Sequence, residues 1–200
     1  MTVERHTLKS LLEEHPNDRS SIVLDTETTG LNPDEDNILS LAVLDARTMQ
    51  PLYNSYFWPK GMRSWHQAQR VNGISYQMVR DEPSFASERE TIQKIIDDAD
   101  VIIGYNVGFD MDFLESNLIE FGDQFISDVM FEFAEFYGEP DYYHCDCRWK
   151  SLVFAADYTD YKEYNAHDAF EDCKATLHVM RYIDDHPNEH PYESIENSSN

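Results

Sequence analysis

Two carboxylates separated by one residue follow an apolar run near the start of the chain. Residues 21–30 read SIVLDTETTG, so a predicted buried strand ends in Asp25 and Glu27. Side chains two apart on a strand point to the same face, about 6.5 to 7 Å apart along the backbone, and this spacing suits two acids that bind one cation. The chain has 39 acidic residues, so the same triplet is also expected by chance, as a polar turn after a strand.

Two further sites with acidic residues lie downstream, each at a predicted helix start. Asp110 falls in the first turn of a helix that follows the apolar run 101–105, at the carboxyl end of that strand, where open α/β sheets place ligands. Asp172 borders the packing stripe of the last long helix and is predicted to face the sheet, with His167 near the start of that helix. A carboxylate that faces a core must be paired or bound to metal. The structural alternatives are an anion favoured near a helix N-terminus and a capping or surface histidine.

Alternating apolar and amphipathic segments predict the elements that position these residues. After the opening strand, further strands are expected at 38–44, 53–58, 101–105 and 124–127, and helices at 88–99, 109–121, 129–137, 148–157 and 166–182. The second and third strands are joined by a short loop and therefore pair antiparallel. A three-stranded meander followed by alternating strands and helices predicts an α/β fold, a mixed five-stranded sheet flanked by helices.

The predicted domain has an extension at each end. Residues 1–20 form a helical extension, with Leu8, Leu11 and Leu12 on one side. Residues 21–184 form the α/β domain. Residues 185–200 have almost no apolar content and are expected to be disordered or only partly ordered.

Composition favours a globular protein of a reducing compartment. The chain has 200 residues, 41% of them hydrophobic, which suffices for a substantial core. No stretch approaches the ~20 apolar residues of a membrane span, and the first residues lack the apolar core of a secretory signal. Three cysteines, an odd count, argue against a disulfide framework. We therefore expect a cytoplasmic protein without membrane contacts.

The formal net charge of −24 should repel nucleic acids at long range, but the charge is unevenly distributed. Residues 46–80 contain no Asp or Glu. The cations in this acid-free segment are Arg47, Lys60, Arg63, Arg70 and Arg80, and its aromatic residues are Tyr53, Tyr56, Phe57, Trp58, Trp65 and Tyr76. Cations interleaved with rings are typical of a surface that binds a single nucleic-acid strand, for which Arg63 and Arg70 are candidate contacts. The alternative is a sheet strand and a basic loop whose rings belong to the core.

Two other features leave alternatives open. His144, Cys145, Asp146 and Cys147 could bind zinc together with Cys173 or a nearby His, although Cys-x-Cys is a poor match to zinc spacing and an ordinary loop explains it as well. The acidic surplus suits a solvated face adapted to high salt, a docking surface for a basic partner, or a means of restricting substrates to those that can enter a cleft.

Together the acidic sites resemble the three motifs of the DnaQ-like 3′ to 5′ exonucleases, in the DEDDh branch. The matching residues are Asp25-x-Glu27, Asn106-x-x-Phe109-Asp110 and His167-x-x-x-x-Asp172, with lesser matches at Phe57-x-Pro59, Val71-Asn72-Gly73-Ile74 and Ser151-Leu152. The sister branch has Tyr four residues before its last Asp, where this chain has Asp168, and this favours the His branch. The resemblance covers residues 21 to about 184 and implies a ribonuclease H-like fold.

The resemblance also implies roles for individual residues. Asp25, Glu27, Asp110 and Asp172 would hold two divalent ions, Mg²⁺ or Mn²⁺, and His167 would take a proton from the attacking water. It further implies that Thr28 and Glu27 meet the 3′-terminal nucleotide, that Leu31 wedges against its base, and that Asn106 contacts a phosphate. Asn72 departs from the family, which often has His in that turn. All-oxygen ligands agree with Mg²⁺ or Mn²⁺ rather than zinc.

Two functions are therefore compared. The first is a metal-dependent 3′ to 5′ exonuclease that acts on single-stranded DNA or RNA ends, alone or beside a polymerase or another nucleic-acid-processing complex. The second is a scaffold or binding subunit that kept the fold and lost activity. Proofreading, RNA trimming, oligonucleotide degradation and end processing all remain open as biological tasks.

Overall fold

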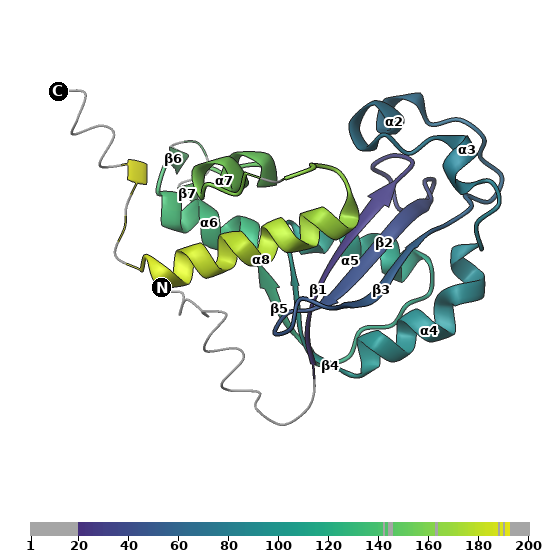
Figure 1. Ribbon diagram of the computed structural model, residues 1–200, viewed down its shortest axis with the longest axis horizontal. Helices are drawn as coiled ribbons and strands as arrows, with labels where there is room; N and C mark the ends of the chain where they lie inside the picture. Colours follow the sequence, from purple (N-terminus) through teal and green to yellow (C-terminus); the bar gives the residue numbers. More distant parts are fainter. Residues whose placement is uncertain are drawn as a thin grey trace.

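The fold is built on a mixed five-stranded sheet, as predicted. In the computed structural model, residues 20–141, 143, 146–162, 164–187, 189 and 191–192 are described. The strands are β1 (Ser20–Thr28), β2 (Ile38–Asp45), β3 (Pro51–Tyr56), β4 (Ala99–Gly104) and β5 (Phe125–Asp128), in the spatial order β3-β2-β1-β4-β5. Antiparallel pairing joins β1, β2 and β3, and parallel pairing joins β1, β4 and β5. The central strand β1 therefore lies at the boundary between the two pairing types (Figure 1).

Alternating residues of the central strand bury apolar side chains on both faces of the sheet. Val23 packs on the face covered by α6 (Val129–Tyr137), α7 (Leu152–Tyr158) and α8 (Ala169–Asp185), and Figure 1 shows the long α8 crossing the sheet. Ile22 and Leu24 pack on the opposite face, against α4 (Phe85–Asp97) and α5 (Val107–Ser116). Burial on both faces explains why the strand reads as a continuous apolar run.

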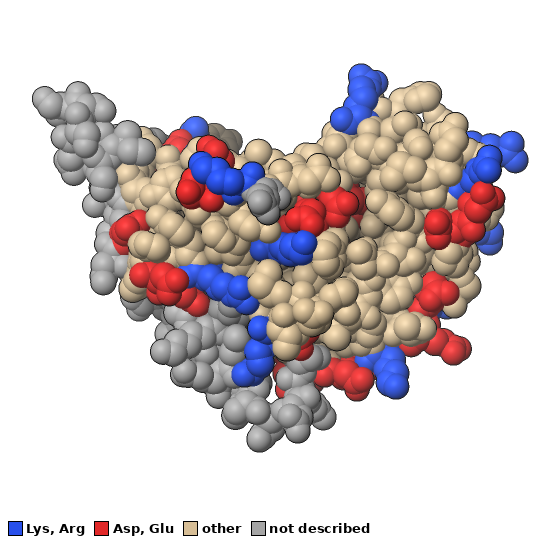
Figure 2. Space-filling model, viewed as in Figure 1, with Lys and Arg blue, Asp and Glu red and all other residues tan. Residues whose placement is uncertain are grey.

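The acid-free segment 46–80 contains two short helices that the sequence analysis did not predict. They are α2 (His66–Asn72) and α3 (Tyr76–Val79), and they pack around Trp65, whose indole nitrogen donates a hydrogen bond of 2.7 Å to the Ile74 carbonyl. Phe57 and Trp65 are buried, so these two rings belong to the core, as the structural alternative for this segment proposed. Figure 2 shows the surface hollowed between the α2–α3 region and the α7 side, with acidic side chains near the floor of the hollow.

Several helices begin or end at other residues than predicted. The helix expected at 109–121 is α5 and already ends at Ser116, because Leu118 adopts the left-handed conformation (φ 65°) and the Ile119 amide returns to the Leu114 carbonyl. The helix expected at 148–157 begins at Leu152, after the Ser151 cap. The helix expected at 166–182 is α8, which begins at Ala169 because Asp168 caps it. The helix at 129–137 has the predicted bounds.

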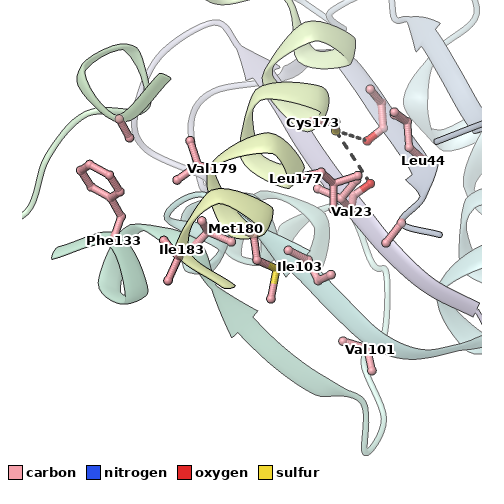
Figure 3. Packing of buried hydrophobic residues seen from close by; sticks show 14 of the residues in the cluster. Val23, Leu44, Val101, Ile103, Phe133, Cys173, Leu177, Val179, Met180 and Ile183 are labelled. Carbon is pink, nitrogen blue, oxygen red and sulfur yellow. Dashed lines mark hydrogen bonds between the residues drawn. The ribbon is translucent and has the colours of Figure 1, made fainter. Parts of the chain in front are cut away.

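Cys173 belongs to α8 and is buried in the core on the side of the helix that faces the sheet. Its Sγ is 3.8 Å from the carbonyl oxygen of Val23 and 3.7 Å from that of Ala42, and Leu177 lies beside it one turn further along the helix (Figure 3). Burial raises the pKa of the Cys173 thiol. Cys173 is therefore not available to a zinc site with Cys147, which lies in the two-residue strand β7 (Asp146–Cys147), paired with β6 (Pro140–Asp141).

Some predicted features lie outside the described residues. These are the N-terminal helical extension, except Ser20, and His144 and Cys145 of the possible zinc group. Of the predicted tail, Asp185 still belongs to α8, Pro191 is buried, and the ring of Tyr192 lies 6.4 Å from that of Tyr137. These residues pack on the domain, and the expectation that residues 185–200 are disordered or only partly ordered stays a prediction. Among the described residues, the helices are too short or too polar to cross a membrane.

Candidate active site

Four carboxylates from three separate segments meet where β1 and β4 end. Asp25 and Glu27 share the face of β1 that carries Val23, so they lie on the side of the sheet covered by α8. Asp110 lies in the first turn of α5, and Asp172 in the first turn of α8. Glu27, Asp110 and Asp172 are buried, and Asp25 is partly buried. The sequence predicted that these four residues lie at one edge of the sheet, and in the structure they lie there.

Thr26 fixes the position of Asp110. Its side chain points to the other face of β1 from Asp25 and Glu27, and its backbone amide and hydroxyl donate to the same oxygen of Asp110, at 2.8 and 2.6 Å. The two hydrogen bonds tie the end of β1 to the first turn of α5. The remaining oxygen of Asp110 can therefore serve a ligand while the carboxylate stays in place.

Burial is the largest cause of the raised pKa values in this cluster, and neighbouring carboxylates add to it. Burial, followed by the charges of Asp110 and Asp172, raises the pKa of Asp25 well above its usual value. Burial and the Asp172 charge raise the pKa of Glu27 to about 8. Burial raises the pKa of Asp110 to about 7 and that of Asp172 to about 6, although both carboxylates accept hydrogen bonds that oppose the shift. Such a cluster is stabilised by protons or by cations.

His167 and Tyr164 surround Asp172. The backbone amide of His167, which has a positive φ of 66°, donates to Asp172 at 3.2 Å, and the Tyr164 hydroxyl donates to the same carboxylate. Asp168 caps α8 through the amides of Phe170 and Glu171. The cap and the turn before it hold the exposed His167 imidazole over the end of the sheet.

The donor set suits divalent cations. One ligand atom each of Glu27, His167 and Asp172 lies within 4.8 Å of the others, and the charges of Asp25 and Asp110 act on the same site. Carboxylate oxygens are the ligands that Mg²⁺ and Mn²⁺ prefer, and the raised pKa values indicate that positive charge is needed there. These residues therefore fit the implied metal ions.

A cavity of about 690 Å³ opens beside the carboxylates. Its walls are the end of β1, the loop after it, α2 and the start of α5, and its lining includes Glu27, Thr28, Leu31, Val71 and Phe109. Leu31 is 84% exposed, and such exposure of a large apolar side chain at a cavity mouth suits contact with a flat apolar ring. The volume lies within the range of small-molecule pockets.

Asn72 connects the acid-free segment to the carboxylates. Its Nδ2 donates to the Thr28 carbonyl at 3.1 Å, and its Oδ1 accepts from the Ile74 amide at 3.1 Å. The same amide group hydrogen-bonds the Glu27 carboxylate and thereby lowers its pKa against the effect of burial. Asn72 therefore orients Glu27 from across the cavity.

Of the other predicted substrate contacts, Thr28 lines the cavity, whereas Asn106, Arg63 and Arg70 do not. The Thr28 hydroxyl is bonded to the Gly30 carbonyl. Asn106 caps α5 in the left-handed conformation, and its backbone amide donates a hydrogen bond to the Asp128 carboxylate at 2.9 Å. Arg63 and Arg70 are exposed but do not line the cavity, and Arg70 Nε donates to the His66 carbonyl within α2. Contact of these two arginines with a substrate stays a prediction.

A family model identifies the relationship of the whole domain. The model RNase_T, described as an exonuclease, matches residues 22–180, which include all three motifs. The chain belongs to this exonuclease family.

Two curated proteins and a solved structure illustrate the family. The DNA polymerase III subunit epsilon of Rickettsia conorii is 32% identical over 100 residues, 48% of this chain and 43% of that protein. The 3′-5′ exonuclease DinG of Bacillus subtilis is 30% identical over 112 residues, 54% of this chain and 12% of that protein. E. coli exonuclease I in complex with a dT13 oligonucleotide has a TM-score of 0.70 at 19% identity, over 84% of this chain and 42% of that chain. The chain thus spans less than half of each, and the last match supports the ribonuclease H-like fold.

Several residues of the site were not predicted from the sequence. Thr26, Asn72 and Tyr164 each hold a carboxylate through a hydrogen bond, and Phe109, named above only as part of the second motif, lines the cavity. The position of Thr26 between two acids could have indicated its role. Asn72 and Tyr164 reach the site only through tertiary folding, so their spacing in the sequence carried no signal.

Proposed function

We propose that the protein is a metal-dependent 3′ to 5′ exonuclease that hydrolyses the terminal phosphodiester bond of single-stranded DNA or RNA and releases nucleoside 5′-monophosphates. The observation that carries this proposal is the convergence of three buried carboxylates and the partly buried Asp25 beside a cavity large enough for a nucleoside. Membership of the exonuclease family supports it.

In this proposal Asp25, Glu27, Asp110 and Asp172 hold two divalent ions, Mg²⁺ or Mn²⁺. When bound, the ions neutralise the carboxylates, lower the pKa of water and stabilise charge on the attacking and leaving oxygens of a phosphodiester. Thr26 and Asn72 keep Asp110 and Glu27 in place, because each donates a hydrogen bond to its carboxylate. Fixed ligands reduce the reorganisation needed when the substrate enters.

His167 accepts the proton of the attacking water in this mechanism. Its imidazole is exposed and has a ring nitrogen within 4.8 Å of the carboxylate oxygens of Glu27 and Asp172. A neutral imidazole at this position can take a proton and pass it to solvent.

The terminal nucleoside occupies the cavity. Leu31 and Phe109 contact the base, and Thr28 and Glu27 meet the sugar, so the phosphate that links it to the next nucleotide lies over the carboxylates. The exposed Leu31 lies at the rim of the cavity, and the volume of about 690 Å³ accommodates a nucleoside. This arrangement restricts cleavage to a chain end.

The relatives support the direction and the single-stranded substrate. DinG of Bacillus subtilis is named a 3′-5′ exonuclease, and the E. coli exonuclease I structure contains a dT13 oligonucleotide. The epsilon relative is a subunit of DNA polymerase III, which supports a polymerase or another nucleic-acid-processing complex as a partner. The described site has no feature that favours a silent scaffold over an enzyme.

Digestion of 5′-labelled single-stranded DNA, duplex DNA and RNA with Mg²⁺ and with Mn²⁺ tests this function. The proposal predicts a ladder that shortens from the 3′ end, strongest on a single strand and absent in EDTA. Asp25→Asn should lose this activity, and Asp45→Asn, an acid at the far end of β2, serves as the control. No ladder from the wild-type chain with either metal would overturn the proposal.

A further inference from the structure

Two aromatic side chains outside the cavity are exposed and contact each other. The rings of Phe131 and Trp149 lie 5.2 Å apart between centroids at an interplanar angle of 86°. Phe131 is 46% exposed and Trp149 is 59% exposed. Solvent-exposed rings in contact are typical of binding surfaces rather than of a monomer core. The cavity and the carboxylates do not explain this pair.

The aromatic pair lies next to the loop that leads to Asp110. Phe131 is in the first turn of α6, and the Asp128 cap of that helix accepts from the Asn106 amide at 2.9 Å and from the Met130 amide at 3.0 Å. On the side of Trp149, the Tyr105 hydroxyl donates to the Lys150 carbonyl at 3.0 Å. Tyr105 and Asn106 therefore connect both rings to the edge of the sheet that carries the active site.

The chain offers rings rather than cations at this position. The neighbouring Arg148 and Lys150 both pair with Glu139, and Lys150 also lies 5.0 Å from the centroid of the Tyr137 ring. With a net charge of −24, the protein repels phosphates at long range. Base stacking on aromatic side chains adds affinity for a single strand without phosphate contacts.

The positions of the cavity and the carboxylates indicate the direction in which a bound nucleic-acid strand would run. The terminal nucleoside cavity lies beside the β1–β2 loop, and the carboxylates follow at the ends of β1 and β4. A nucleic-acid strand that continues along the carboxyl ends of β1 and β4 passes Asn106 and reaches β5 and α6. We propose that Phe131 and Trp149 form a stacking platform for bases on the 5′ side of the scissile bond. This inference rests on the proposed exonuclease function.

Kinetics on substrates of two lengths test the platform. The substrates are a thymidine dinucleotide and an oligothymidylate of about ten nucleotides, a length within known single-strand site sizes. In Phe131→Ala and Trp149→Ala, the ratio of KM for the long substrate to KM for the dinucleotide should rise about tenfold, the effect expected for one lost stacking contact. Trp149→Phe should keep the wild-type ratio, because it keeps a ring.

Leu118→Ala is the matched control, because Leu118 is exposed and lies beyond the opposite end of α5. Oligothymidylate should also quench tryptophan fluorescence, and Trp149→Phe should lose that quenching. Thermal melting of each variant confirms that it is folded. If the wild type hydrolyses neither these substrates nor the corresponding uridine dinucleotide and oligouridylate, the proposed function fails. If it hydrolyses both lengths and neither alanine variant changes the KM ratio, the platform alone is overturned and the pair belongs to a protein contact.

Discussion

At the scale of single residues, the site depends on side chains that hold the carboxylates as much as on the carboxylates themselves. Asp110 is fixed by Thr26, Asp172 by His167 and Tyr164, and Glu27 by Asn72. Groups that orient metal ligands commonly affect metal affinity or activity 10- to 100-fold. Variants of these residues therefore test the site without removing a ligand.

Asn72→Ala should weaken Mn²⁺ binding by about tenfold, because Glu27 loses the amide that orients it. Calorimetric titration of Mn²⁺ into the variant measures this change. Asn72→His should retain most of the affinity, since the family often has His in this turn and an imidazole can donate a hydrogen bond. Gln69→Ala, on the same helix but outside the cavity, is the control. Equal affinities for the Ala variant and the wild type would contradict a positioning role for Asn72.

At the scale of elements, the sequence predicted best those elements whose burial pattern is regular. β1, β2 and α6 carry continuous apolar runs or stripes, and the motifs adjoin their ends or those of β4 and α8, so the position of the carboxylates could be inferred. By contrast, α2 has no buried residue and therefore no amphipathic signal. The cavity joins α2 to the β1–β2 loop, and contacts between segments so far apart leave no local pattern.

The hydrogen bonds from Thr26 of β1 to Asp110 of α5 lead to a prediction about stability. Thr26→Val should lower the free energy of unfolding of the metal-free protein by about 1 to 3 kcal/mol, because the buried Asp110 carboxyl loses the hydroxyl donor at 2.6 Å. Urea unfolding measures the change. Thr26→Ser keeps the hydroxyl and should retain most of the stability. If the Val variant proves as stable as the Ser variant, the hydrogen bond does not hold strand and helix together.

At the scale of the whole molecule, the acidic surplus and the carboxylate cluster make stability depend on pH and metal. The pKa values are about 8 for Glu27, about 7 for Asp110 and about 6 for Asp172, all above those of an unfolded chain. The folded metal-free protein therefore binds protons more tightly than the unfolded chain. These groups add stability that is fully present below about pH 4 and is lost progressively as the pH rises to about 8.

Thermal melting in EDTA should therefore give a lower Tm at pH 8 than at pH 6, and saturating Mn²⁺ should raise the Tm more at pH 8. Repulsion across the net charge of −24 contributes as well, so the melts are repeated at high salt, which screens exposed charges more than buried ones. A Tm in EDTA that rises from pH 6 to pH 8 at high salt would contradict the raised pKa values.

The most direct test of the central claim is the stoichiometry of Mn²⁺ binding by calorimetry at pH 8. The account predicts two ions per chain for the wild type, held by Asp25, Glu27, Asp110 and Asp172. It predicts that Asp110→Asn loses at least one of them, while Asp45→Asn keeps both. Wild-type protein that binds no Mn²⁺, or an Asp110→Asn variant that binds both ions with unchanged affinity, would contradict a metal centre at these carboxylates.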